Sequence, residues 1–256
     1  MGGFYSRVEA GLAAMRLSKL ARAVKRQHLT YLSYAKLHRL EDALEDAVAS
    51  DIEGAFLEFG VALGGSAILI AEAAQRAGER FAGFDVFGMI PPPASEKDDT
   101  QSKTRYVTIV SGKAAGIGGE TYYGYRERLY DDVVAAFARN GLTVDGNRIA
   151  LVKGLFEDTW PSAGIRAVAF CHIDCDWYDP VRFCLDRVTP LLSGGGTIVL
   201  DDYHDYGGCR LATDEFLASH PGFELQDGPN VMVRRRSVGA GLHRAETSLP
   251  RAGAAR

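Results

Sequence analysis

The sequence contains no apolar run long enough to cross a bilayer and no large excess of positive charge. A membrane-spanning helix needs about 20 consecutive apolar residues, so we expect no membrane partner. The formal net charge is -4 over 256 residues, whereas nucleic-acid-binding domains are usually basic, so we expect no nucleic-acid partner. Residues 1–25 carry charges throughout and have no continuous apolar stretch of the kind found in secretory signals. We therefore expect a cytoplasmic protein.

Cysteine is scarce, and its four copies are Cys171, Cys175, Cys184 and Cys209. Their spacing does not match that of zinc fingers, which argues against a cysteine-rich zinc site. Because disulfides are rare in reducing compartments, we interpret all of these cysteines as free thiols. The composition, 46% hydrophobic and 24% charged, is ordinary for a globular protein. The length suffices for one large α/β domain or two small ones.

The sequence also lacks the glycine signatures of the two commonest nucleotide cradles. The turn at 58–66 has neither the G-x-G-x-x-G spacing nor the Walker ending, which disfavours a dinucleotide pyrophosphate and ATP. Glu58 precedes the first glycine, and a carboxylate there would repel phosphate and favour a cationic ligand. Asp85 follows about 20 residues after the turn, where nucleoside-binding α/β folds place an acid that accepts hydrogen bonds from ribose hydroxyls. A ligand with an adenosine, a positive centre and no phosphate, such as S-adenosylmethionine, fits both features.

Short apolar runs alternate with amphipathic stretches and glycine turns after about residue 54, which predicts a doubly wound α/β fold. Five buried strands are expected, at 55–60, 81–85, 148–152, 167–173 and 196–200. Two further runs, 223–225 and 231–233, predict an antiparallel hairpin that completes a mostly parallel sheet of seven strands.

Three segments depart from this alternation. Residues from about 5 to 50 have helical apolar spacing, and we expect an N-terminal helical cap at 1–50 in front of a main domain at 51–236. Segment 88–125, rich in proline, charge and glycine, predicts a mobile lid, although a solvated insertion without a binding role remains an alternative. The charges at 96–99 are expected to be solvated. The tail 237–256 lacks apolar periodicity, which predicts disorder.

The lid segment contains four tyrosines that could contact a substrate, at positions Tyr106, Tyr122, Tyr123 and Tyr125.

Carboxylates follow two of the apolar runs. Asp174 and Asp176 come after the fourth expected strand, and Asp201 and Asp202 come after the fifth. The carboxyl ends of neighbouring parallel strands meet at one edge of a sheet, so up to four carboxylates should converge. Such a concentration of negative charge is costly unless a cation or a proton compensates it. An oxygen-rich site suits Mg²⁺, Mn²⁺ or Ca²⁺ better than zinc. The alternative is that each aspartate only caps the following helix.

The turn at 58–66 resembles motif I of class I methyltransferases. Four further elements follow it in the order seen in the macrocin O-methyltransferase family, at 84–88, 154–161, 173–178 and 200–203. The resemblance extends over about residues 52 to 233. It implies the Rossmann-like class I fold, S-adenosyl-L-methionine as donor, and Mg²⁺-dependent methylation of hydroxyls of sugars or phenols in natural products.

The resemblance also implies roles for individual residues. The metal ligands of the family fall on Asp174, Asp201 and Asp202, and its proposed general base falls on Asp176. His204 is an alternative base or a surface-loop residue. Candidate contacts of the cofactor lie in the glycine turn and after the second, third and fourth strands: Glu58, Phe59, Gly60, Gly64, Ser66, Asp85, Phe156, Glu157 and Asp174.

The chemistry of these residues agrees with that role. A sugar hydroxyl is a poor nucleophile at neutral pH, but coordination to Mg²⁺ lowers its pKa, and a carboxylate can then accept its proton. We therefore predict a Mg²⁺-dependent O-methyltransferase that acts on a sugar hydroxyl of a natural product, nucleotide sugar or glycoside. The alternatives are a phenolic acceptor and a metal-dependent hydrolase that uses the same acidic cluster. We also expect a homo-oligomer, a dimer paired through the N-terminal helices.

Three neighbours of the acids are less specific. His172 lies within an apolar strand and is interpreted as a core histidine whose hydrogen-bonding groups are satisfied. Trp177 and Tyr178 could stack on a sugar or an aromatic ring, or pack in the core.

Overall fold

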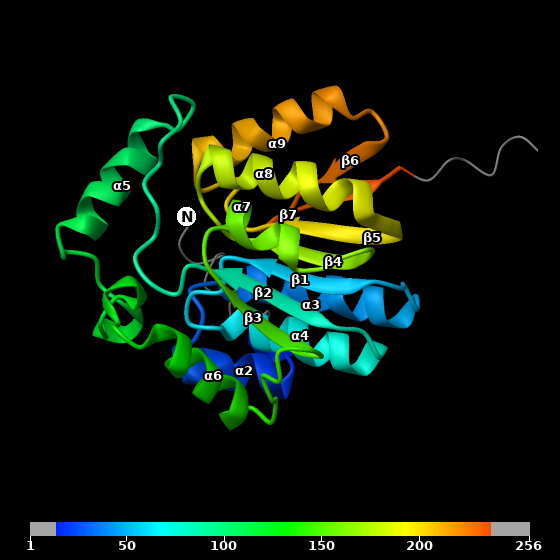
Figure 1. Ribbon diagram of the computed structural model, residues 1–256, viewed down its shortest axis with the longest axis horizontal. Helices are drawn as coiled ribbons and strands as arrows, with labels where there is room; N and C mark the ends of the chain where they lie inside the picture. Colours follow the sequence, from blue (N-terminus) through cyan, green and yellow to red (C-terminus); the bar gives the residue numbers. More distant parts are fainter. Residues whose placement is uncertain (1–13, 237–256) are drawn as a thin grey trace, which may run out of the picture.

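In the computed structural model, which describes residues 14–236, one seven-stranded sheet has the order β3-β2-β1-β4-β5-β7-β6 (Figure 1). The strands, in chain order, are β1 (Ala55–Phe59), β2 (Phe81–Asp85), β3 (Ile149–Lys153), β4 (Val168–Ile173), β5 (Leu192–Leu200), β6 (Phe223–Gln226) and β7 (Val231–Arg235). The first five pair in parallel, whereas β7 runs antiparallel to both β5 and β6. This topology confirms the predicted α/β fold of the class I methyltransferase type, including the hairpin at the sheet edge.

The central strands are apolar because helices cover both of their faces. Every residue of β1, β2 and β4 is buried. Alternate residues enter two separate cores, so that Phe56 and Phe170 lie in one while Leu57 and Cys171 lie in the other. The continuous apolar runs in the sequence therefore reflect burial on two sides.

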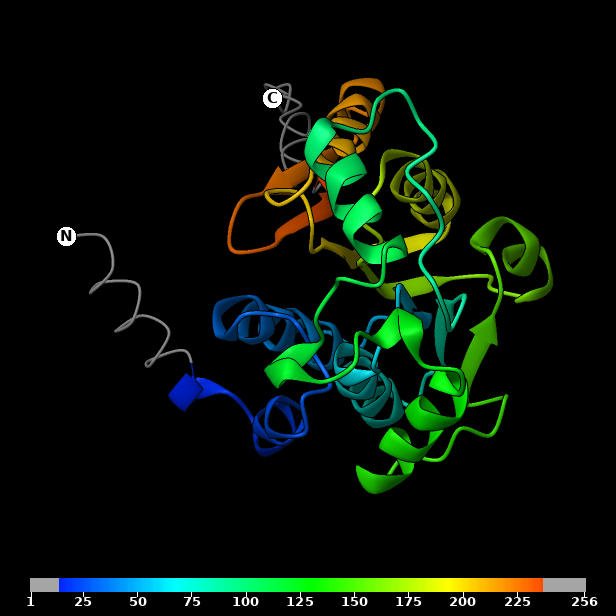
Figure 2. The same ribbon diagram turned by 90° about the vertical axis from the view of Figure 1, so that its left-hand side faces the viewer.

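Helices form a layer on each face of the sheet (Figures 1 and 2). One layer contains α8 (Tyr178–Val188) and α9 (Gly207–Ser219). The other contains α2 (Lys19–Arg26), α3 (Tyr34–Ala49), α4 (Gly65–Ala77) and α6 (Leu129–Arg139). Shorter turns of helix complete the connections: α7 (Phe156–Thr159), η3 (Trp160–Ser162) and η4 (Thr189–Leu191).

The N-terminal layer is helical, as expected from the sequence, and residues 27–33 divide it into α2 and α3. The side chain of Ser33 caps the restart of the helix by accepting a hydrogen bond from the Lys36 N–H at 3.2 Å. The break passes over the glycine turn after β1, where the Gly65 N–H donates to the Leu29 carbonyl at 2.9 Å. A Cβ on Gly65 would lie 2.5 Å from that carbonyl oxygen, so a contact within the chain requires this glycine.

The lid segment contains a helix that the sequence analysis did not predict, α5 (Thr100–Val110), and two short turns, η1 (Ile117–Gly119) and η2 (Tyr123–Tyr125). The side chain of Asp99 caps α5 by accepting from the Ser102 N–H at 2.7 Å. In Figure 1, α5 stands apart from both helical layers, beyond the ends of the sheet. The lid is therefore a structured element that lies beyond the ends of the strands.

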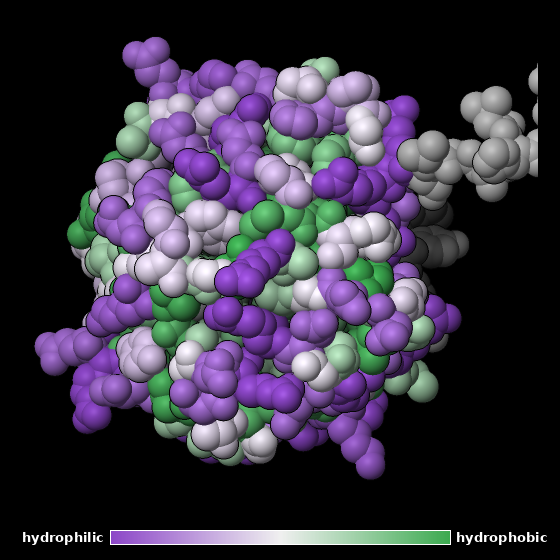
Figure 3. Space-filling view, turned by 45° about the vertical axis from the view of Figure 1, so that its right-hand side comes forward, coloured by the Kyte–Doolittle hydropathy of each residue, from purple (hydrophilic) through white to green (hydrophobic). Residues whose placement is uncertain are grey.

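The surface shown in Figure 3 mixes hydrophobic and hydrophilic side chains, as is ordinary for a protein surface. Among residues 14–236, no helix combines the length and the apolar character that crossing a membrane would require. The predicted disordered tail at 237–256 lies outside the described residues, as do residues 1–13.

Candidate active site

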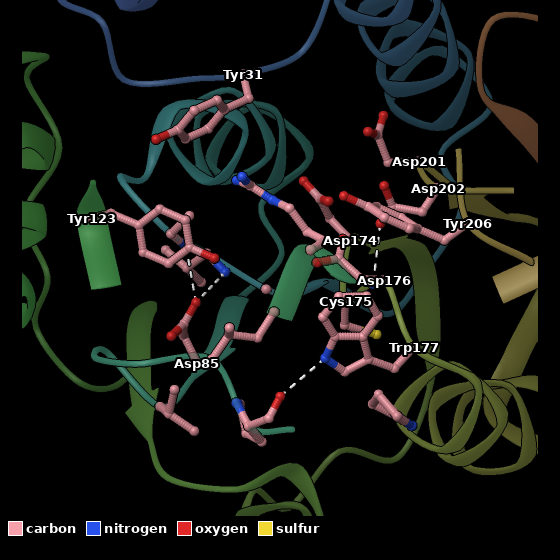
Figure 4. Close-up of a pocket in the computed structure, with 18 of the residues that line it drawn as sticks. Tyr31, Asp85, Tyr123, Asp174, Cys175, Asp176, Trp177, Asp201, Asp202 and Tyr206 are labelled. Atoms are coloured by element: carbon pink, nitrogen blue, oxygen red, sulfur yellow. Dashed lines mark hydrogen bonds between the residues drawn. The ribbon is translucent and has the colours of Figure 1, made fainter. Parts of the chain in front are cut away.

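A cavity of about 1020 Å³ opens where the parallel strands end. Residues after β1, β2, β4 and β5 line one side of it, and the loop at 29–33 together with α5 lines the other. In Figure 4, Asp174, Asp176, Asp201 and Asp202 lie together on one side of the view with Tyr206, whereas Tyr31 and Tyr123 lie on the other side. The cavity thus brings together the glycine turn, the lid and the acids predicted from the sequence.

Asp85 organises the backbone around the glycine turn. Its Oδ2 accepts hydrogen bonds from the N–H groups of Val61 at 2.8 Å and Ala62 at 2.9 Å, and its Oδ1 accepts from Phe87 at 2.6 Å. The carboxyl group lines the cavity but is buried, and burial raises its pKa. Three backbone donors therefore hold this carboxylate in place, in addition to the hydrogen bonds that it is expected to accept from ribose hydroxyls.

Gly60 allows the ends of β1 and β4 to touch. A Cβ at this position would lie 1.8 Å from the Asp174 carbonyl oxygen. The Asp174 N–H also donates to the Phe59 carbonyl at 2.9 Å. Both Gly60 and Asp174 line the cavity, so this contact fixes the glycine turn directly beside the first carboxylate of the acidic cluster.

The remaining residues predicted to contact the cofactor fall into two groups. Ser66, Phe156 and Glu157 line the cavity. Glu58, Phe59 and Gly64 do not line it. Glu58 and Phe59 are fully buried in the sheet, and Gly64 is the N-cap of α4, in the left-handed conformation.

Glu58 instead pairs with His172 inside the sheet. Its Oε1 lies 2.8 Å from Nδ1 of that histidine, and both side chains are fully buried. His172 is thus a core histidine, as predicted, although its Nε2 has no partner among residues 14–236. Glu58 and His172 are register partners two residues before Gly60 and Asp174, so the pair is buried in the sheet next to the acidic cluster.

Three aspartates converge in the cavity (Figure 4). One carboxylate oxygen from each of Asp174, Asp176 and Asp202 lies within 4.8 Å of the other two. Asp202 belongs at the same time to a second group, in which Asp201 and Asp205 are its neighbours under the same distance limit. The predicted convergence at the ends of β4 and β5 is present, and the four expected aspartates divide between two overlapping groups.

Asp176 is held in an uncommon backbone conformation, with a φ of 60°. Its N–H donates to Oδ2 of Asp202 at 3.2 Å. Left-handed geometry costs energy for any residue but glycine, and such residues cluster at functional sites.

The cluster is electrostatically crowded. Burial, followed by repulsion from neighbouring carboxylates, raises the pKa of Asp174 and of Asp202 well above the ordinary range. Burial raises the pKa of Asp176 to about 6. Carboxylates that are this close and this buried hold protons or a cation, because they cannot all be charged alone.

The donor set fits a hard divalent cation. Its atoms are carboxylate oxygens, the ligands that Mg²⁺, Mn²⁺ and Ca²⁺ take in proteins. Oδ1 of Asp201 is buried and has no hydrogen-bonding partner among the described residues. An oxygen left in this state is consistent with a ligand that the chain itself does not provide.

His204 lies away from this cluster. It does not line the cavity, and its Nε2 pairs with Oδ1 of Asp227 at 3.0 Å, in the connection between β6 and β7. The structure therefore does not bring this candidate base together with the acids.

The start of the lid is fastened to both helices that follow the acidic strands. Asp98 is buried and accepts from the N–H of Tyr178, the first residue of α8, at 2.8 Å. Asp99 accepts from the N–H of Gly207, the first residue of α9, at 2.9 Å. The expectation of a solvated charge run at 96–99 is therefore wrong for these two residues, because each satisfies an unpaired N–H at a helix start.

Replacing Asp99 by alanine should lower the free energy of unfolding by about 1–3 kcal/mol, since it removes the cap of α5 and the bond to α9. Urea denaturation would measure the loss, and limited proteolysis should show faster cleavage within 88–125. Glu96→Ala is the matched control, because Glu96 belongs to the same charge run and is exposed. Equal effects of the two substitutions would contradict the clamping role.

Two of the four lid tyrosines line the cavity, namely Tyr122 and Tyr123, whereas Tyr106 and Tyr125 do not. Trp177 also lines it and donates from Nε1 to the Pro91 carbonyl at 3.0 Å, which ties the lid to the acidic side (Figure 4).

Among the cavity residues that the sequence analysis missed, four have an aromatic ring or a positive charge: Tyr31, Lys36, Arg105 and Tyr206. Three of them carried no local signal, because Tyr31 and Tyr206 lie in loops and Arg105 lies in the unpredicted α5. Lys36 carried a weak local signal, because it lies in the first turn of α3, where the helix dipole disfavours a cation and a compensating partner is needed.

Comparison with known proteins agrees with this geometry. The sequence model of the family described as Macrocin-O-methyltransferase (TylF) matches residues 13–117 and 120–223. The chain belongs to the macrocin O-methyltransferase family. As a member of this family, it is an S-adenosylmethionine-dependent O-methyltransferase.

Two characterised O-methyltransferases are identical to this chain at about a quarter of the aligned positions. Demethyldecarbamoylnovobiocin O-methyltransferase of Streptomyces niveus is 24% identical over 208 residues, which cover 77% of this chain and 70% of the relative. The 8-demethyl-8-(2,3-dimethoxy-alpha-L-rhamnosyl)-tetracenomycin-C 4'-O-methyltransferase of Streptomyces olivaceus is 26% identical over 218 residues, which cover 82% of this chain and 77% of the relative. The solved structure of the O-methyltransferase NovP has the same fold, with a TM-score of 0.68, 22% identity, and 90% of this chain and 99% of NovP covered.

Proposed function

We propose that this enzyme methylates a hydroxyl of a sugar unit in a natural product and that a divalent ion, Mg²⁺ in the cell, assists it. The observation that carries the proposal is the convergence of Asp174, Asp176 and Asp202 in the same cavity as the glycine turn and Asp85. The relatives support the acceptor class, since one of them is named for methylation of a rhamnosyl group on a tetracenomycin.

The volume of the cavity supports an acceptor and a donor bound together. At about 1020 Å³ it lies at the upper end of the range for small-molecule sites. Gly60, Ser66 and Asp85 line the part near the glycine turn, where we place the donor. Phe156 and Glu157 line the same cavity from α7, as expected for neighbours of the adenine.

For the ion, we assign Asp174, Asp201 and Asp202 as ligands, as the family resemblance implies. The free Oδ1 of Asp201 and the shared place of Asp202 in both acidic groups support this choice. When bound, a divalent ion lowers the pKa of an acceptor hydroxyl and orients it. The fixed positions of β4 and β5 keep these carboxylates in place before any ion arrives.

Asp176 is the better candidate for the general base. During transfer the hydroxyl oxygen forms a bond to the methyl carbon, the carbon–sulfur bond breaks toward sulfur, and the hydroxyl proton must leave. Asp176 lines the cavity beside Asp174, whereas His204 faces Asp227 outside it. A carboxylate within reach of the hydroxyl can accept the proton directly.

The aromatic lining of the cavity favours an acceptor with a ring. Besides Phe156, which we place near the adenine, five aromatic side chains line the cavity, and their rings can pack on a sugar or on an aromatic group: Tyr31, Tyr122, Tyr123, Trp177 and Tyr206. A phenolic acceptor is therefore the second candidate. The hydrolase alternative is not supported, because the family is one of O-methyltransferases. Pairing into a dimer stays a prediction from the sequence.

The test combines binding and turnover. We expect S-adenosylhomocysteine to bind in calorimetry without added metal, because two of the three proposed ion ligands, Asp201 and Asp202, lie outside the donor side of the cavity. Methyl transfer to 6-deoxyhexosyl glycosides, followed by mass spectrometry, should stop with EDTA and return with Mg²⁺ or Mn²⁺.

Each component of the proposal can fail separately. Transfer that continues in EDTA would contradict the ion, and transfer to phenols alone would contradict the sugar acceptor. Absence of S-adenosylhomocysteine binding would contradict the assignment of the donor site.

A further inference from the structure

Lys36 comes from the N-terminal layer but reaches the acidic cluster. It is the third residue of α3 after the cap at Ser33, and its side chain is only 14% exposed. A lysine in the first turn of a helix is opposed by the helix dipole, and burying its ammonium adds a further cost. Its position therefore needs compensation from partners outside the helix.

The ammonium has three partners on one loop. Nζ of Lys36 donates to the carbonyl oxygen of Asp201 at 2.9 Å, to Oδ2 of the same residue at 2.9 Å, and to Oδ2 of Asp205 at 2.6 Å. All three N–H bonds of the ammonium are thereby used. These three oxygens surround the ammonium as oxygen ligands surround a bound metal cation, and the cation here is the side chain of Lys36.

The two acidic groups differ in this respect. The group of Asp201, Asp202 and Asp205 has the Lys36 ammonium between two of its members. The group of Asp174, Asp176 and Asp202 has no lysine or arginine ion pair among residues 14–236. Asp201 stands at the boundary, with Oδ2 taken by the ammonium and Oδ1 free.

We propose that Lys36 is a positioning residue of this enzyme: its ammonium occupies the cation position on the Asp205 side of the Asp201–Asp202 pair and leaves only the Asp174 side to a divalent ion. The inference deepens the proposed function and rests on its ion site. It explains why five neighbouring aspartates need not hold two ions. It also makes the N-terminal layer part of the catalytic centre.

The same loop is also held from the lid. Nε2 of Gln101 in α5 donates to the Asp205 carbonyl at 3.2 Å. The loop after β5 thus lies between α3 and α5, and Lys36 provides the charged contact. Without the ammonium, the carboxylates of Asp201 and Asp205 would repel each other with no cation between them.

The experiment counts bound Mn²⁺ by electron paramagnetic resonance, using the full chain. The unchanged protein should bind one ion. Lys36→Met, which keeps the length of the side chain and removes the charge, should bind a second ion with a dissociation constant below about 1 mM, as expected for a site of few carboxylates. Lys36→Arg keeps a cation in place and should again bind one.

Two controls assign the second ion. Adding Asp205→Asn to Lys36→Met should remove it. Lys25→Met is the matched control, because Lys25 is a part-buried lysine that donates to the carbonyls of Thr30 and Leu32 and pairs with no carboxylate within residues 14–236. It should leave the ion count unchanged.

The proposal and the proposed function fail in different ways. The role of Lys36 would be overturned if the unchanged protein and Lys36→Met both bound one ion with equal affinity, or if neither bound an ion. No ion in the unchanged protein but one in Lys36→Met would contradict the divalent-ion site and support Lys36.

If Lys36→Met does not fold, Asp205→Asn alone decides the question. Asp205 is exposed, so this variant should fold and bind its ion within about threefold of the unchanged affinity. A much larger loss would place the ion on the Asp205 side and overturn the proposal.

Discussion

Asp202→Asn should lower kcat by about 10³-fold, the largest effect that we expect from a single substitution, because it removes a carboxylate shared by both acidic groups. The loss reflects a weaker cation site and a poorly activated hydroxyl. Asparagine keeps an oxygen that can accept the N–H of Asp176, as Oδ2 of Asp202 does at 3.2 Å. The shape of the loop should therefore survive the change. Initial rates at saturating Mg²⁺ would measure the effect.

Two further measurements separate chemistry from folding in this variant. Its thermal stability should equal or exceed that of the unchanged protein, because one buried carboxylate fewer relieves repulsion. The affinity for S-adenosylhomocysteine should change by no more than a few fold. Asp179→Asn is the matched control, since Asp179 also lines the cavity but is exposed. A variant that loses donor affinity as strongly as rate would contradict an ion-binding role for Asp202.

The second large effect is expected at Asp85. Asp85→Asn should weaken the binding of S-adenosylhomocysteine by about 100-fold, because an amide NH₂ must then face one of three backbone N–H groups, and hydrogen bonds to a charged group contribute about 1.5–3 kcal/mol each. Isothermal titration calorimetry would measure the change. In either orientation of the amide, the backbone at Phe87 or at Val61 and Ala62 loses its acceptor and should lose its fixed conformation.

Asp145 offers the control for this substitution. Its Oδ1 also accepts from two backbone N–H groups, those of Asn147 at 2.8 Å and Ile149 at 3.1 Å, in a turn that does not line the cavity. Asp145→Asn should cost some stability and leave the affinity for S-adenosylhomocysteine unchanged. Unchanged affinity in Asp85→Asn would show that this carboxylate does not organise the donor site.

The sheet could be predicted from the sequence because its signals are local. Each central strand is a short apolar run, since helices cover it on both faces, and each acid follows such a run directly. Asp174 and Asp202 could therefore be placed at one sheet edge from chain order alone. The convergence of their carboxylates then follows from parallel pairing between β4 and β5.

The lid could not be predicted in the same way, because its structure depends on distant partners. The residues of α5 include threonines, serine and valines, which are weak helix formers. The cap at Asp99 belongs to a run of charges that suggests solvation. Only the folded chain brings the first residues of α8 and α9 to Asp98 and Asp99. The contacts of Lys36 span 165 residues or more, which no local pattern contains.

The glycine turn was interpreted only in part. Gly60 and Gly64 were expected to contact the cofactor, but Gly60 and Gly65 are needed because other segments of this chain lie against them. Glu58 and Phe59 belong to the motif, yet strand geometry sends their side chains into the two layers beside the sheet.

The contact between Gly60 and Asp174 limits how such an enzyme can change. With no room for even one methyl group between these two strand ends, the spacing from donor to acceptor chemistry is a constant of the scaffold. Variants selected for new acceptors should therefore keep this pair and accumulate their substitutions in the lid and in the loop at 29–33. Swapping those two segments between relatives offers a direct route to altered substrate range.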